Sequence, residues 1–284
     1  MPEWVEGGGA ARPSAPELRV VPTSGERREG GDRRRRSRVR IAAVGDFHVG
    51  EEDAGAYRDL FSSANDDADV LVLCGDLTRR GLAVEFKTVV AELADVKIPI
   101  VVVLGNHDYE SGQGAEGTTI LRGRGAHVLA GDAFQLNEHV GFAGVKGFMG
   151  GFGRGTLTAF GEPETKAFVA AALEEVQRFE LALRRLATPV RVAVLHYSPV
   201  AGTVAGEPEM IFPFLGTDRL AEPIDRYGCA IAFHGHAHQG TFRGQTPGGV
   251  PVYNVSLPLL RKDGVGKLFY VHEIAIPTPS ASTG

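Results

Sequence analysis

The sequence has few cysteines and no long hydrophobic run. Only Cys74 and Cys229 occur in 284 residues, and both lie in apolar segments that are typical of strands. We therefore expect two reduced core thiols and no disulfide framework. Apolar stretches such as residues 98–104 are far shorter than the about 20 residues that cross a bilayer, and the N-terminus lacks a signal-peptide pattern. These features predict a cytoplasmic protein without a membrane span.

Acidic residues outnumber basic ones in the chain, and one segment departs from this balance. The formal net charge is −5, which excludes a general binder of polyanions. The exception is a basic run directly before the first predicted strand, formed by Arg33–Arg36, Arg38 and Arg40. We interpret it as a solvated arm, with a patch for nucleic acid or a membrane surface as the alternative.

Both ends of the chain differ in composition from its middle. Gly, Pro, Arg and Ser dominate residues 1–37, and a similar bias marks residues 277–284. These segments are predicted to be a flexible arm and a flexible tail. No repeat or long linker divides residues 38–276, which are predicted to form one domain.

The middle of the chain opens with alternating strand and helix patterns. Strands are predicted at 39–44, 70–74 and 100–104, with helices at 54–64 and 83–93 between them. An amphipathic helix is predicted at 164–186, and later strands at 133–136, 140–145, 190–195, 230–233, 252–255 and 268–274. Nearly unbroken Val, Ile and Leu in the first strands indicates parallel strands covered on both faces. The pattern predicts an α/β fold of two stacked mixed β-sheets flanked by helices.

Polar residues follow these strands at positions where a core would not select them. Asp46 and His48 follow the first strand, Asp76 the second, and Asn106, His107 and Asp108 the third. His196 follows the strand at 190–195, and His234, His236 and His238 follow the strand at 230–233. Because the carboxyl ends of parallel strands lie side by side, these groups are expected to converge in one crevice. A mixture of imidazole and carboxylate suits Mn, Fe, Zn or Ni better than Ca or Mg.

The order of these groups resembles a known family. Asp46-x-His48, Gly75-Asp76, Gly105-Asn106-His107-Asp108, His196 and Gly235-His236-x-His238 look like the ordered motifs of calcineurin-like metallophosphoesterases. The resemblance implies a four-layer α/β/β/α sandwich and hydrolysis of a phosphate ester by a bridging hydroxide in a dinuclear metal site. The segment from Gly75 to Gly81 is similar to the Icc-related branch with cyclic-nucleotide phosphodiesterase-like enzymes, which favours a phosphodiester substrate.

The resemblance also implies a role for each residue. It places Asp46, His48, Asp76 and His238 on one metal, and Asp76, Asn106, His196 and His236 on the other, with Mn favoured. His107 would face the substrate phosphate and act as a catalytic acid, and Asp108 would orient its ring. His234 is either a structural residue or a support for the ligands. For Asp46, Asp76 and Asn106 the alternative is helix capping, which would not require the histidines.

Several alternatives stay open at this level. The chain could be a phosphomonoesterase or a DNA nuclease of the same superfamily, although its acidic body argues against nucleic acid. A non-catalytic metal-binding scaffold is disfavoured because every ligand position carries a competent residue. The glycine-dense stretch 146–155 is a candidate lid, and Arg80 or Arg154 a candidate contact for a second phosphate or a base. The physiological substrate and the oligomeric state do not follow from the sequence.

Overall fold

The computed structural model describes residues 38–262 and 268–276. The arm predicted over residues 1–37, with most of the arginine run, and the tail predicted over 277–284 lie outside the described residues. Among the helices within these two ranges, none combines the length and the apolar composition of a membrane-spanning segment.

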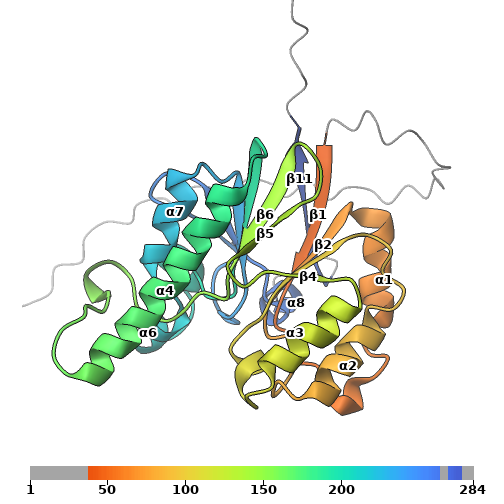
Figure 1. Ribbon diagram of the computed structural model, residues 1–284, viewed down its shortest axis with the longest axis horizontal. Helices are drawn as coiled ribbons and strands as arrows, with labels where there is room; N and C mark the ends of the chain where they lie inside the picture. Colours follow the sequence, from red (N-terminus) through yellow and green to blue (C-terminus); the bar gives the residue numbers. More distant parts are fainter. Residues whose placement is uncertain (1–37, 263–267, 277–284) are drawn as a thin grey trace, which may run out of the picture. The chain divides into compact units, whose positions relative to one another are not determined.

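The first sheet has five strands in the order β11-β1-β2-β3-β4. Its first four strands along the chain are parallel, and β11 pairs antiparallel with β1. The strands are β1 (Arg38–Val44), β2 (Val70–Cys74), β3 (Ile100–Val103), β4 (His127–Val128) and β11 (Tyr270–Ala275). Three helices lie on one side of this sheet in Figure 1, namely α1 (Arg58–Asp67), α2 (Ala83–Glu92) and α3 (Gly114–Gly123).

The second sheet has six strands in the order β5-β6-β7-β8-β10-β9. Its four central strands are parallel and its two edge strands are antiparallel to their neighbours. The strands are β5 (Asp132–Gln135), β6 (Val140–Gly144), β7 (Val190–Val194), β8 (Ile231–His234), β9 (Arg243–Gln245) and β10 (Pro251–Asn254). On the opposite side of the molecule from α1–α3 lie α4 (Pro163–Arg185) and α7 (Ala221–Arg226), as Figure 1 shows.

Alternating side chains on the second sheet explain how the layers stack. Phe142, Val192 and Phe233 belong to the core that also contains the strands of the first sheet. Their neighbours Ala143, Ala193 and Ala232 belong instead to a core with residues of α4 and α7. Because successive strand residues point to opposite faces, the second sheet contacts the first sheet on one face and helices on the other. The prediction of two mixed sheets flanked by helices is confirmed.

The first helix begins later than its pattern predicts. α1 starts at Arg58 instead of residue 54, after a short 3₁₀ turn over Glu51–Asp53. The buried carboxylate of Glu92 accepts hydrogen bonds from the backbone N–H of Gly55 at 2.5 Å and of Tyr57 at 2.7 Å. This long-range contact holds the segment before Arg58 out of the helix, and a local pattern does not reveal it.

The sequence patterns miss α3 and the shortest strands. α3 contains Gly114, Gly117 and Gly123, and glycine lowers helix propensity. Gly117 is required there by packing, because a Cβ atom at this position would collide with the ring of Phe86 on α2. β4 has two residues and β9 has three, too few for an alternating pattern to stand out. The remaining short helices are α5 (Ala201–Val204), α6 (Phe212–Leu215) and α8 (Leu257–Lys262).

Candidate metal centre

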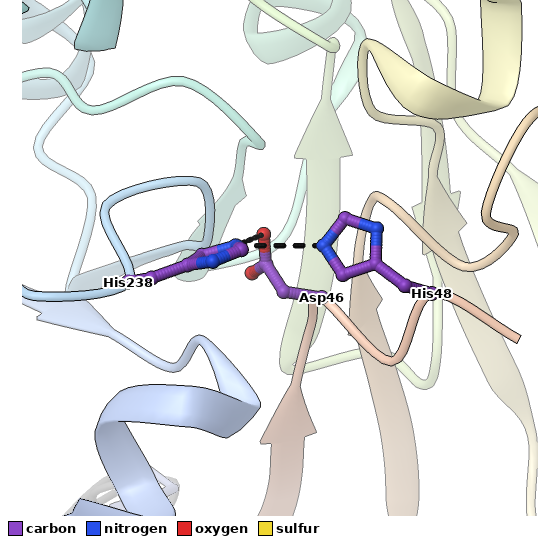
Figure 2. A group of neighbouring side chains, drawn as sticks. All are labelled: Asp46, His48 and His238. Atoms are coloured by element: carbon purple, nitrogen blue, oxygen red, sulfur yellow. Dashed lines mark hydrogen bonds and ion pairs between the residues drawn. The ribbon is translucent and has the colours of Figure 1, made fainter.

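Loops from both sheets bring most of the predicted site residues together. One group joins the loop after β1 to the loop after β8. His238 Nε2 lies 3.0 Å from Asp46 Oδ1 and 3.5 Å from His48 Nε2, although these side chains are about 190 positions apart. Figure 2 shows the rings of His48 and His238 pointing toward the Asp46 carboxylate from either side. These three residues have ligand atoms close enough to share one metal ion.

A second group lies beside the first and joins the loops after β2, β3 and β7. His196 Nε2 is 2.9 Å from Asn106 Oδ1 and 3.4 Å from Asp76 Oδ1. His48 Nε2 is 3.9 Å from Asp76 Oδ2, so Asp76 contacts residues of both groups. Asn106 precedes a 3₁₀ turn without capping it through its side chain. Helix capping therefore does not account for Asn106.

His236 completes the second group. Its ring lies 4.8 Å from the ring of His196, and its ligand atoms fall within reach of Asp76 and His196. The Nε2 atom lies 3.1 Å from the carbonyl oxygen of Phe214. Since a carbonyl only accepts, Nε2 carries the proton and Nδ1 keeps its lone pair for a ligand.

Three glycines leave room for the carboxylates and the buried histidine. A Cβ atom at Gly105 would collide with the Asp76 carboxylate, and one at Gly235 would collide with the Asp46 carboxylate. At Gly75, where φ is +84°, it would lie 2.5 Å from His196 Nδ1. The glycine in each motif therefore has a steric reason.

Burial and mutual contact shift the pKa values of the carboxyl and imidazole groups in the centre. Burial and the neighbouring carboxylates of Asp46 and Asp108 raise the pKa of Asp76 to about 9. Burial also lowers the pKa of His48 to about 4 and the pKa of His196 well below its usual range. For Asp46, burial acts to raise the pKa, but the hydrogen bond and charge of His238 and further imidazoles outweigh it and lower it.

The donor atoms fit a metal ion. The Nδ1 of His196 donates to the carbonyl of Cys74 at 2.9 Å, so its Nε2 carries a lone pair. This lone pair faces the oxygens of Asn106 and Asp76, an arrangement that suits a bound cation, whose place the Asp76 proton takes in the metal-free protein. Imidazole, carboxylate and amide ligands suit first-row transition metals.

His107 and Asp108 differ from their expected arrangement. The His107 ring lies 4.7 Å from that of His48, so it borders the centre, and its Nδ1 donates to the Arg79 carbonyl at 2.9 Å. The prediction that Asp108 orients this ring is wrong. The buried Asp108 carboxylate accepts hydrogen bonds from backbone N–H groups of Leu77, Thr78 and Gly105 and from the Thr78 hydroxyl. It ties the loop after β2 to the loop after β3, and a backbone carbonyl orients the ring instead.

His234 is structural in its contacts. It is fully buried, with Nε2 2.8 Å from the Thr203 hydroxyl and Nδ1 2.7 Å from the Gly235 carbonyl. Both ring nitrogens therefore have protein partners, and the residue supports the turn that carries His236.

Lys146 and Tyr197 border the centre and were not predicted from the sequence. The Lys146 carbonyl accepts from the backbone N–H groups of His196 and Tyr197, and the Lys146 ammonium lies 5.1 Å from the Tyr197 ring centre. The Tyr197 ring in turn lies 4.4 Å from that of His236. Neither residue belongs to a recognisable motif; the adjacency of Tyr197 to His196 was the available signal.

The candidate lid and the candidate residue Arg80 have defined surroundings. The lid segment is tied to the loop around α6 by Gly150 N–H to the Pro213 carbonyl and Gly151 N–H to the Gly216 carbonyl, both at 2.9 Å. Arg80 lines a hollow with Arg79 and three glutamates, Glu51, Glu52 and Glu85, and this excess of carboxylates does not favour a second phosphate.

Comparison with known proteins assigns the fold and the site to one class. The sequence pattern of calcineurin-like phosphoesterases matches residues 39–240, so the chain belongs to this family. Family membership together with the His/Asp clusters makes it a metal-dependent phosphoesterase.

Two solved structures illustrate the likeness. The fold is similar to that of phosphopantetheinyl hydrolase (PptH) from Mycobacterium tuberculosis, with a TM-score of 0.60 and 15% identity over 87% of this chain and 99% of that chain. It is also similar to TT1561 of Thermus thermophilus, with a TM-score of 0.52 and 14% identity over 84% of this chain and 99% of that chain. At these identities the likeness is one of fold. No curated protein matches the sequence significantly.

Proposed function

We propose that the chain hydrolyses a phosphodiester with two bound metal ions, Mn being favoured. The observation that carries the proposal is the convergence of His196 Nε2, Asn106 Oδ1 and Asp76 Oδ1 beside the group of Asp46, His48 and His238. Asp76 touches both groups and is the proposed bridge. When bound, two such ions supply an activated water and neutralise the charge of the phosphate. The likeness of residues 75–81 to the Icc-related branch supports a diester over a monoester.

His107 is the proposed catalytic acid. The Arg79 carbonyl fixes its Nδ1, so Nε2 remains available to the substrate, and 40% of the side chain is exposed. In its protonated form Nε2–H can donate to a phosphoryl oxygen and then to the departing alkoxide. Such a group contributes typically about 10²- to 10⁴-fold to the rate.

Matched esters test the proposal in one assay. The full chain with added Mn should hydrolyse bis-p-nitrophenyl phosphate faster than p-nitrophenyl phosphate, and EDTA should abolish both activities. Faster monoester hydrolysis would favour a phosphomonoesterase, cleavage of DNA a nuclease, and no hydrolysis despite bound metal a scaffold. A panel of cyclic nucleotides, nucleotide diphosphate conjugates and a phosphopantetheinyl-carrying protein would then narrow the substrate class.

A substitution separates the catalytic role of His107 from metal binding. His107→Gln should keep its metal content and lose about 10²-fold or more in kcat. His139→Gln, a change of the same type on a half-buried histidine paired with Glu138, is the matched control and should behave like the parent. Hydrolysis of a diester with an alkyl leaving group by His107→Gln at the parent rate would refute the assigned role, because an alkoxide needs the proton that p-nitrophenolate does not.

A further inference from the structure

The most exposed apolar side chains of the described residues gather on two loops. Met210 is 82% exposed, Phe160 81% and Phe214 55%, and Leu157 in the same loops is 38% exposed. We call these four residues the apolar rim. Large exposed apolar groups that gather in one region mark an interaction site, whereas isolated ones need no explanation.

The two loops of the apolar rim form one unit. Leu157 N–H donates to the Gly150 carbonyl at 2.7 Å, and Gly150 N–H donates to the carbonyl of Pro213, the residue before Phe214. Figure 1 shows the loop before α4 beside α6. Other apolar residues of this unit are used in its own small core, in which Phe152, Ile211 and Phe212 pack against Val204, Leu215 and Ala237. The rim side chains are therefore not required for that core.

Phe214 connects the apolar rim to the candidate metal centre. The Phe214 carbonyl accepts the hydrogen bond from the His236 ring at 3.1 Å. Met210 is four residues from Phe214, and one residue spans at most about 3.6 Å, so its backbone lies within about 15 Å of that contact. A ligand held at the centre by its phosphate can therefore extend over the rim.

Whatever binds to the apolar rim must leave the metal centre accessible and must be compatible with the charges around the rim. A protein covering Phe214 would also cover the approach to His236, whereas a group attached to the phosphate itself would not. Exposed carboxylates of Glu162, Glu164 and Glu209 flank the most exposed rim residues, but exposed Arg154 and Lys166 and the Arg219 guanidinium, which donates to the Leu157 carbonyl at 2.9 Å, lie on the same segments. The charges offset one another, so the surroundings supply no net attraction for an anionic lipid surface.

We propose that the substrate is an amphiphilic phosphodiester whose alkyl or acyl chain lies on the apolar rim while its phosphate occupies the metal centre. The inference rests on the proposed function and adds the class of substrate. Each methylene that is partly or fully removed from water on the rim should strengthen binding by about two- to fourfold.

A chain-length series tests this inference. The Mn-loaded full chain is assayed with p-nitrophenyl methyl, butyl and octyl phosphate below their aggregation concentrations. We expect kcat/KM to rise at least tenfold from methyl to octyl, chiefly through KM. In the double variant Phe160→Gln/Met210→Gln the octyl-to-methyl ratio should fall toward one. Leu181→Gln, which removes a 46% exposed leucine on α4 outside the rim, should keep the parent ratio.

A binding measurement separates this inference from the proposed function. Octylphosphonate should bind the Mn-loaded parent at least tenfold more tightly than methylphosphonate by calorimetry, and the double variant should lose the difference. Equal affinities, with an octyl-to-methyl ratio near one, would overturn the inference and leave the diesterase proposal intact. If the parent instead sediments with phosphatidylcholine vesicles and the double variant does not, the rim is a membrane contact and the inference is equally overturned. Tighter octylphosphonate binding without turnover would support the rim and refute the diesterase.

Discussion

Replacing Asp108 by asparagine tests whether this residue builds the centre or acts on His107. Its carboxylate accepts hydrogen bonds at 2.6–3.2 Å from four donors, three on the backbone and one on the Thr78 side chain. Asparagine replaces one accepting oxygen with an NH₂ group that faces those donors. A hydrogen bond to a charged group contributes about 1.5–3 kcal/mol, and a buried unsatisfied donor costs about 1–3 kcal/mol. We therefore expect Asp108→Asn to lose about 2–4 kcal/mol of unfolding free energy.

The assay compares urea unfolding and Mn affinity of the variant and a matched control. Glu92→Gln also changes a buried carboxylate that accepts two backbone hydrogen bonds, but away from the centre. Both variants should be destabilised. Only Asp108→Asn should bind Mn more weakly, because Asp108 holds Leu77 and Thr78 directly after Asp76. Parent stability and parent Mn affinity combined with lost turnover would refute this reasoning and restore a direct role on His107.

Four further predictions concern the ligands and their glycines. Asp76→Asn should empty at least one metal site by elemental analysis. Because the folded metal-free protein holds the Asp76 proton up to a pKa of about 9, Mn binding at pH 7 should release a proton and strengthen as pH rises, which calorimetry in buffers of different ionisation enthalpy detects. Gly105→Ala should lose Mn, because the added Cβ atom collides with the Asp76 carboxylate. Gly123→Ala, which has open space on α3, should bind Mn normally, and its free energy of unfolding should rise by up to about 1 kcal/mol. In the metal-free protein His48→Val should be less stable than His48→Asn by about 1 kcal/mol, since position 48 has a φ of 48°; equal urea midpoints would contradict this.

The sequence predicts the site residues whose positions follow from the order of the strands. It does not predict those whose positions depend on contacts between distant parts of the chain. Polar residues after buried strands were enough to expect that Asp46 and Asp76 meet, because β1 and β2 are parallel neighbours whose ends meet at one edge of a sheet. His196 follows β7 of the second sheet, so its place beside them depends on how the two sheets stack. The sequence does not reveal the partners of the Asp108 carboxylate, since Leu77 and Thr78 lie about 30 positions away, whereas the ring of His107 belongs to the neighbouring residue. Lys146 was missed for a similar reason. Its place beside His196 follows from the pairing of β6 with β7 and not from a motif.

Several backbone φ angles at the metal centre differ from those that non-glycine residues prefer, and they occur at the predicted metal ligands. Asp46, His48, Asp76 and His236 are the four non-glycine residues with positive φ in the described ranges, at 62°, 48°, 49° and 70°. A left-handed conformation costs about 1–2 kcal/mol for such residues, so glycine would be favoured if only the turn mattered. Hydrogen bonds across the loops hold three of these positions, from Asp46 N–H to the Gly75 carbonyl, from His48 N–H to the Asp76 carbonyl, and from His236 N–H to the Asp46 carboxylate. Backbone strain is therefore retained at four adjoining residues, and hydrogen bonds among the same loops maintain it. A preorganised set of metal ligands requires such an arrangement.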